Sequence, residues 1–134
     1  MKAIFDGVKT LYDGSGGATL RAANPGGLWR ERAPQKTTYP FIVMHHLGGG
    51  QRDTFKEYIE HMTIQFNVYD DSANDDKIDD ISTKLMALFD WCALTITGYT
   101  HVVCQRTFSQ SFRNEEENIW QYVIQYYIEA RKVS

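Results

Sequence analysis

The most regular pattern in the chain is an alternation of apolar and polar residues between about residues 57 and 69. The apolar positions are Met62, Ile64, Phe66 and Val68. Because successive side chains of a β-strand point to opposite faces, this period of two predicts a strand with one buried face. The same alternation recurs between about residues 118 and 131, where it predicts a second strand.

Two further segments are expected to pair with these strands. Tyr39-Pro40 opens an apolar run over residues 41–47, and a proline is tolerated at the start of a strand because its missing N–H need not join the ladder. The other segment covers about residues 100–112, followed by a polar turn at 113–117. The sequence thus predicts two hairpins, the first with a long tip at 48–57.

Two segments predict helices, because apolar residues recur in them at intervals of three and four. The first spans about residues 3–12 and ends at the glycines that begin with Gly14. The second spans about 73–91, with Ser72 as its expected cap and Asp75 three positions later. The apolar stripe of the second helix is Ile78, Ile81, Leu85, Leu88 and Phe89.

This order of elements, α-β-β-α-β-β, predicts an α+β fold. We expect an antiparallel sheet of about four strands with two helices packed on one face. A length of 134 residues fits a single domain over residues 1–134. Two long flexible loops are expected, at about 13–38, which is rich in Gly, Pro, Asn and Arg, and at 48–57.

The second face of the sheet is polar but carries almost no charge. Its amide side chains are Gln65, Asn67, Gln121 and Gln125. Contact surfaces between proteins are depleted in charge at their centre, which favours an interface here. A solvated antiparallel face is the alternative.

Charge and composition exclude several classes of protein. The net charge of −3 and the pI of about 5.7 do not suit a nucleic-acid binder, which needs a basic face. No apolar run approaches the roughly 20 residues that span a bilayer, so we expect no membrane partner. Cys92 and Cys104 are not in CxxC spacing, which favours free thiols and synthesis in a cytoplasm; a disulfide between them is the alternative.

No group of residues has the pattern of a catalytic or metal site. His45 and His46 point to opposite faces of one strand, and His61 alone does not complete a metal site. The acidic residues between Asp70 and Asp80 lack the glycine and glutamate of an EF-hand. The sequence has no GxSxG elbow and no phosphate-binding loop. We therefore expect no enzyme, no cofactor and no metal.

The two predicted loops hold the remaining candidates for partner contacts. Trp29 lies among charged residues in the first loop, where it would anchor either the loop or a partner. The candidates in the two loops are Trp29, Arg30, Arg32, Arg52, Asp53, Phe55 and Lys56.

Three stretches of the chain resemble the tail completion family of tailed bacteriophages, also called tail terminators. They are Arg32-Ala33-Pro34-Gln35, Tyr39-Pro40-Phe41-Ile42-Val43, and the strand from Ile64 to Ser72 that runs into a helix. The resemblance covers nearly the whole chain in order of elements, but the glycine-rich segment 13–28 and Gly48–Gly50 depart from the family pattern.

The resemblance implies a virion protein, made in the host cytoplasm, that stays monomeric until it assembles as a hexameric ring. Such a ring caps the tail tube, ends tail polymerisation and joins the tail to the head connector, while DNA passes through it. One alternative is another neck or minor tail protein. A second, of a different class, is a small ligand-binding module with a pocket lined by Phe66, Phe89 and Trp120.

Overall fold

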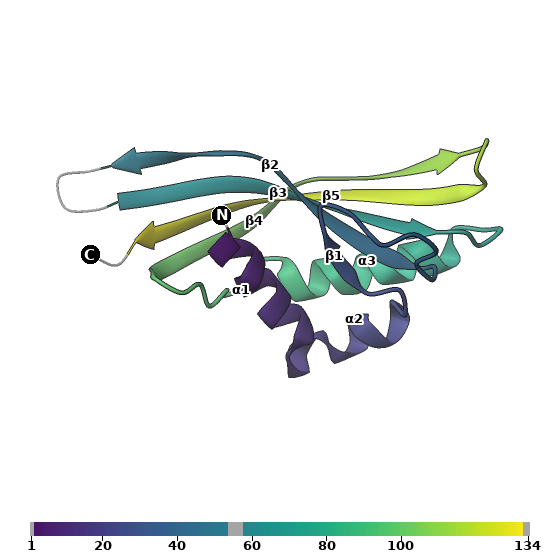
Figure 1. Ribbon diagram of the computed structural model, residues 1–134, viewed down its shortest axis with the longest axis horizontal. Coiled ribbons are helices and arrows are strands. Elements are labelled where there is room, and N and C mark those ends of the chain that lie inside the picture. The colour runs from purple at the N-terminus through teal and green to yellow at the C-terminus, as the bar shows by residue number, and fades with distance from the viewer. Residues whose placement is uncertain (1, 54–57, 133–134) are drawn as a thin grey trace.

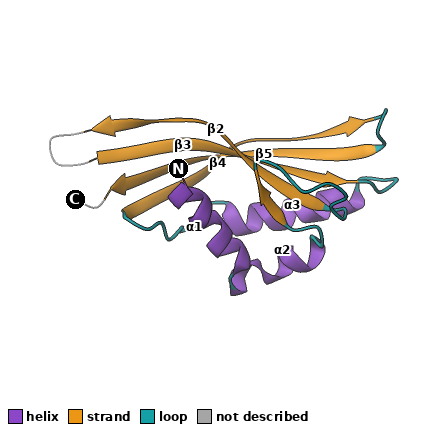
Figure 2. Ribbon diagram, viewed as in Figure 1, coloured by secondary structure: helices purple, strands orange, loops and turns teal. Residues whose placement is uncertain are grey.

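The protein is a long, twisted β-sheet with all of its helices on one side (Figures 1 and 2). The computed structural model describes residues 2–53 and 58–132, leaving aside the side chains of 49–53, 58, 101 and 102. The helices are α1 (Lys2–Asp13), the 3₁₀ turn η1 (Ser15–Gly17), α2 (Ala18–Ala23) and α3 (Asp76–Phe89). The α+β class is therefore confirmed.

Within the described residues, the sheet has five strands in the order β1-β2-β3-β5-β4. They are β1 (Leu28–Arg30), β2 (Phe41–Asp53), β3 (Tyr58–Asp70), β4 (Tyr99–Asn114) and β5 (Ile119–Lys132). The four long strands alternate in direction, as the two predicted hairpins require. The short β1 pairs in parallel with residues 42–44 of β2, so the sheet is mixed rather than purely antiparallel.

One core lies between the helices and the sheet. The predicted apolar face of β3 is buried along its length, as is the stripe of α3 apart from the half-buried Leu88. Phe66 of β3 stacks on Phe89 of α3 with ring centroids 4.9 Å apart. Tyr126 of β5 and Phe66 form a T-shaped pair with centroids 5.9 Å apart. These rings join α3 to the centre of the sheet.

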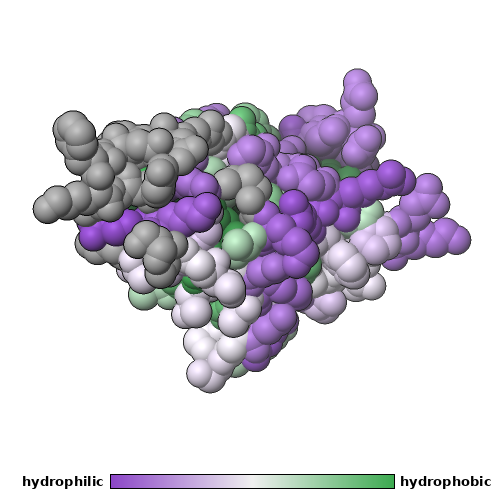
Figure 3. All heavy atoms as spheres, turned by 60° about the vertical axis from the view of Figure 1, so that its left-hand side comes forward, coloured by the Kyte–Doolittle hydropathy of each residue, from purple (hydrophilic) through white to green (hydrophobic). Residues whose placement is uncertain are grey.

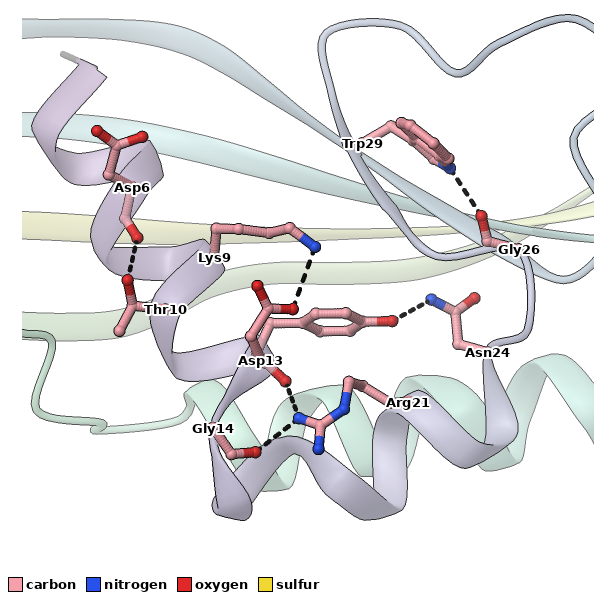
Figure 4. Close-up of polar contacts among 10 residues, drawn as sticks. Asp6, Lys9, Thr10, Asp13, Gly14, Arg21, Asn24, Gly26 and Trp29 are labelled. Carbon is pink, nitrogen blue, oxygen red and sulfur yellow. Dashed lines mark hydrogen bonds and ion pairs between the residues drawn. The ribbon is translucent and has the colours of Figure 1, made fainter.

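The prediction of about four strands and two helices is incomplete, because the segment 13–38 is not one irregular loop. It contains η1, α2 and β1. Arg21 donates from Nη1 to the carbonyls of Tyr12 and of Gly14, the latter at 2.6 Å, and so joins the end of α1 to α2 (Figure 4). Asn24 Nδ2 donates to the Tyr12 hydroxyl at 3.0 Å. Residues 31–38 are the longest part of this segment without a helix or strand.

The first hairpin and the start of α3 also differ from expectation. β2 continues through the three glycines to Asp53, so most of the predicted tip at 48–57 is strand, and residues 54–57 lie outside the described part of the chain. α3 begins at Asp76, and Ser72 does not cap it. The N–H of Ser72 instead donates to Asp70 Oδ2 at 3.3 Å, which holds the chain in a turn before the helix.

Gly26 lies where two segments of backbone come too close for a side chain. Its N–H donates to the Pro40 carbonyl at 2.9 Å, and an added Cβ would lie 1.9 Å from the Thr38 carbonyl oxygen. This contact places β1 beside the start of β2.

Replacing Gly26 with alanine should destabilise the fold by about 1–3 kcal/mol, because the backbone at 38–41 must move to admit the methyl group. The matched control is Gly16→Ala, where an added Cβ meets only the end of Leu88 at 3.7 Å. The free energy of unfolding of the control should lie within about 0.5 kcal/mol of that of the wild type. Urea unfolding of both variants checks this, and equal effects would contradict it.

Tyr99, at the start of β4, is joined to β3 by a short hydrogen bond. Its hydroxyl donates to Glu60 Oε2 at 2.6 Å. That bond, with burial second, raises the pKa of Tyr99 from 10.0 to about 12. The bond therefore stabilises the fold fully below pH 10, and its contribution is lost as the pH rises through 12.

Tyr99→Phe should cost about 1–2 kcal/mol of unfolding free energy at pH 7, and the gap from wild type should narrow between pH 10 and 12. Urea unfolding across that range measures the gap. In the companion variant Glu60→Gln, ultraviolet titration should show Tyr99 ionising at a lower pH than in the wild type. A gap that stays constant up to pH 12 would contradict the assignment.

Candidate assembly surface

The sheet face that points away from the helices is a continuous surface without charge over four rows of residues. Its residues line up in rows across β2, β3, β5 and β4. The first four rows contain no Lys, Arg, Asp or Glu, and a charge first appears at Glu129 in the fifth. We call these four rows the uncharged face: Phe41, Tyr69, Gln121, Phe112; Val43, Asn67, Val123, Gln110; His45, Gln65, Gln125, Phe108; Gly48, Thr63, Tyr127, Gln105.

Four of the predicted contact residues form one hydrogen-bonded network at the centre of this face. Asn67 Oδ1 accepts from Gln65 Nε2 at 2.9 Å and from Gln121 Nε2 at 3.2 Å. Gln125 Nε2 donates to Gln65 Oε1 at 3.0 Å. Asn67 is only 4% exposed, so the network is anchored in the sheet. The amides therefore present an ordered polar surface without any formal charge.

Aromatic rings border the network on the β2 side. The Phe41 ring lies between those of Tyr39 and Tyr69, at centroid distances of 5.2 and 5.1 Å. Burial raises the pKa of the Tyr69 hydroxyl, with a smaller contribution from Tyr39. These hydroxyls stay neutral at physiological pH, which keeps this border of the face free of charge.

Phe108 and Phe112 of β4 belong to the uncharged face, and the sequence alone did not assign them to it. Counting alternate residues from the buried Cys104 places both rings on the core side. A β-bulge between Arg106 and Phe108 reverses the alternation, so that Phe108 opposes Gln125 and Phe112 opposes Gln121. The rings are 40% and 43% exposed. No pattern in the sequence marks the bulge.

The predicted candidates of the first loop lie together at the β1 edge of the sheet. Trp29 is 37% exposed, and its indole N–H donates to the Gly26 carbonyl at 2.7 Å (Figure 4). The Arg30 guanidinium lies 4.3 Å from the centroid of the Phe5 ring. Arg32 follows the strand and is exposed. Trp29 and Arg30, with Phe5, Lys9 and Met44, line an open hollow of about 310 Å³.

Glu31 joins this edge to β2. Its Oε1 accepts the backbone N–H of His46 at 3.0 Å, and its Oε2 lies 3.3 Å from His45 Nδ1. Burial acts to raise the pKa of Glu31, but the hydrogen bonds from His46 and His45 outweigh it and lower the pKa. The Glu31 carboxylate thus accepts the His46 N–H, a backbone donor of β2 that lies just beyond the residues paired with β1.

The other loop candidates do not join either group. Arg52 and Asp53 end β2, opposite Ile59 and Tyr58. Arg52 is eight residues beyond Met44, about 27 Å along the strand from β1. Phe55 and Lys56 lie outside the described residues. The predicted contact residues thus fall into separate groups rather than one patch.

The two exposed tryptophans differ in how they are held. Trp91 was expected to be the last residue of the second helix, but α3 ends at Phe89 and Trp91 is 71% exposed. Its backbone has a φ of 55°, unusual for a bulky residue, and its N–H donates to the Cys104 carbonyl at 3.0 Å. Strained and exposed aromatic residues of this kind are typical of contact sites.

The alternative chemistries find little support in the geometry. Phe66 and Phe89 stack in the core, where the ligand-binding alternative expects a pocket. Within residues 2–53 and 58–132, no three His, Cys, Asp or Glu side chains group as a metal site. Cys92 and Cys104 are free thiols; the contact with Cys92, followed by burial, raises the pKa of Cys104. None of the described helices is long and apolar enough to cross a membrane.

Comparison with known proteins found a solved structure with the same fold and a family profile that matches the sequence. One solved structure, titled as the virion of a native gene transfer agent (GTA) particle, contains a chain with the same fold at a TM-score of 0.79. The likeness covers 93% of this chain and 91% of that chain, at 9% sequence identity. A search of curated protein sequences found no match.

The sequence profile of the family described as "Tail completion protein gp17" matches residues 15–128. That range contains every strand except the last residues of β5, and both groups of contact candidates that the structure describes. The chain therefore belongs to the tail completion family of bacteriophage structural proteins.

Proposed function

We propose that this protein caps the end of a phage tail tube, ends its polymerisation and joins the tail to the head connector. The observation that carries this proposal is the family match across residues 15–128. The fold likeness to a chain of a gene transfer agent virion supports a place in an assembled particle. In this role the protein works by binding, and the uncharged face, β1 with its arginines, and Trp91 are its contact surfaces.

The active form is a ring of identical copies, hexameric by resemblance to the family, built at the end of a finished tube. Monomers persist in solution because single contacts between copies are weak. The tube end gathers copies beside one another, and the segment 32–38, which no helix or strand includes, settles against a neighbour there. Ordering at the moment of binding lowers the affinity of free copies for each other and makes assembly depend on the tube.

DNA passes through the proposed ring without being bound. Binding to DNA depends on lysines and arginines that neutralise phosphates. The chain has a net charge of −3, so it lacks the overall basic character of such binders. Figure 3 shows hydrophilic residues gathered at the centre and right of the side drawn, with hydrophobic residues in smaller areas between them. These properties suit a ring that guides DNA and does not hold it.

The decisive experiment deletes the gene for this protein from the phage genome that encodes it. Electron microscopy should show free heads beside tails longer than those of the wild type. A plasmid copy of the gene should restore joined particles and normal tail length. Joined particles with tails of normal length in the deletion strain would overturn the proposal.

A charge placed in the amide network should block assembly while leaving the fold intact. Gln125→Lys puts an unpaired charge into the uncharged face, which costs about 3–5 kcal/mol where a partner buries it. We expect at least a tenfold loss of joined particles in complementation of the deletion strain. The matched control is Thr83→Lys on the exposed side of α3, which should complement fully. Thermal unfolding of both purified variants shows that each folds, and equal complementation by the two would contradict the role of the face.

A further inference from the structure

The outer edge of β4 has the properties of a strand that pairs with another chain. Every residue from Thr107 to Phe112 is exposed, although the strand is part of the main sheet. β4 ends the sheet, with no further strand beside it in the described part of the chain. The six residues contain no charge and no proline, the features that usually protect a free edge. Their unpaired backbone groups are available to a partner.

The other half of this edge is already covered. The Trp91 N–H donates to the Cys104 carbonyl, so the connection from α3 to β4 lies along the strand there. β2, at the opposite side of the sheet, is covered in the same partial way. β1 pairs with its residues 42–44, and Glu31 accepts the His46 N–H. The side chain of Leu47 is 50% exposed. From this residue to the end of β2, no described strand pairs with the outer side of the strand.

The directions of the strands make these two open edges complementary. β2, β3, β5 and β4 are antiparallel in succession, so β4 runs opposite to β2. A second copy placed beside the first in the same orientation would therefore set its β2 antiparallel to β4 of its neighbour. The ladder that results is the type that already joins the long strands within one copy.

We propose that neighbouring copies join edge to edge, with residues 107–112 of β4 pairing with β2 of the next copy from Leu47 onward. The ring itself belongs to the proposed function, and this pairing names the surfaces that close it. The contact joins two different edges, so each copy can bind one neighbour on each side, as a ring requires. The β2 edge and the β4 edge of one copy thus each bind a different neighbour.

The positions of the open halves add a geometric consequence. The open part of β2 runs to Asp53 and that of β4 runs to Asn114, at opposite ends of the sheet (Figure 1). Pairing them shifts each copy along the strand direction relative to its neighbour. Strands in a closed sheet are tilted and staggered in this way. The exposed Trp91 lies beside the same edge, near its covered half, where it can reach the neighbouring copy.

Cross-linking between introduced cysteines tests the pairing. Leu47→Cys labels the β2 edge and Ser109→Cys labels the β4 edge, both at exposed positions. The double variant, the two single variants and the wild type are treated with a short bismaleimide. Each is treated as concentrated protein and in extracts that contain tail tubes. The wild type measures any background from Cys92 and Cys104.

The double variant should give a ladder of trimers and larger species in the tube extract. An equimolar mixture of the two single variants should stop at dimers, because each copy then carries one reactive edge. Dimers from Ser109→Cys alone would overturn the proposal in favour of symmetric pairing between two β4 edges. The absence of cross-links in both settings would also overturn it.

The outcome can be separated from that of the proposed function. Tail lengths in the deletion strain test capping whether or not the edges pair. If the double variant gives the series of cross-linked species but tails in the deletion strain have normal length, capping is rejected and the edge pairing is kept. Overlong tails in that strain without any ladder would reject the pairing alone.

Discussion

The structure depends on the packing of aromatic rings between α3 and the centre of the sheet. Phe66, Phe89 and Tyr126 lie against one another, and the Tyr126 hydroxyl donates to Asp90 Oδ1 at 2.6 Å. Burial, followed by this bond, raises the pKa of Tyr126. Arg106 of β4 pairs with the same carboxylate at 3.4 Å. One carboxylate thus fixes the end of α3, the centre of β5 and the outermost strand together.

In this arrangement the described helices all pack on one face of the sheet (Figure 2). A chain of this size has apolar residues enough for one core, and the main cluster of buried residues lies on that face. The opposite face and parts of both edges therefore remain available for contacts between proteins. The rigidity that such contacts need comes from the long antiparallel ladders, which hold the amide network in register.

The sequence predicted the long elements well because their patterns repeat over many residues. The alternation in β3 and β5 identified both faces of the sheet, and with them the amides of the network. β1 was missed because three residues cannot show a period, and its pairing depends on the close approach of Gly26 to the segment 38–40. Phe108 and Phe112 were assigned to no face because one extra residue in β4 reverses the alternation. Local geometry of this kind is decided by tertiary contacts.

The amide network also bears on the conditions under which a virion must hold together. Interactions between exposed charges weaken as salt is added, and those of carboxylates change with acidity. Amide groups neither titrate in the physiological range nor attract counterions strongly. A surface centred on Gln65, Asn67, Gln121 and Gln125 keeps the same character in concentrated cytoplasm and in dilute surroundings outside a cell. A protein–protein contact built on such a surface would tolerate the change in salt concentration and pH that follows release of a particle from its host.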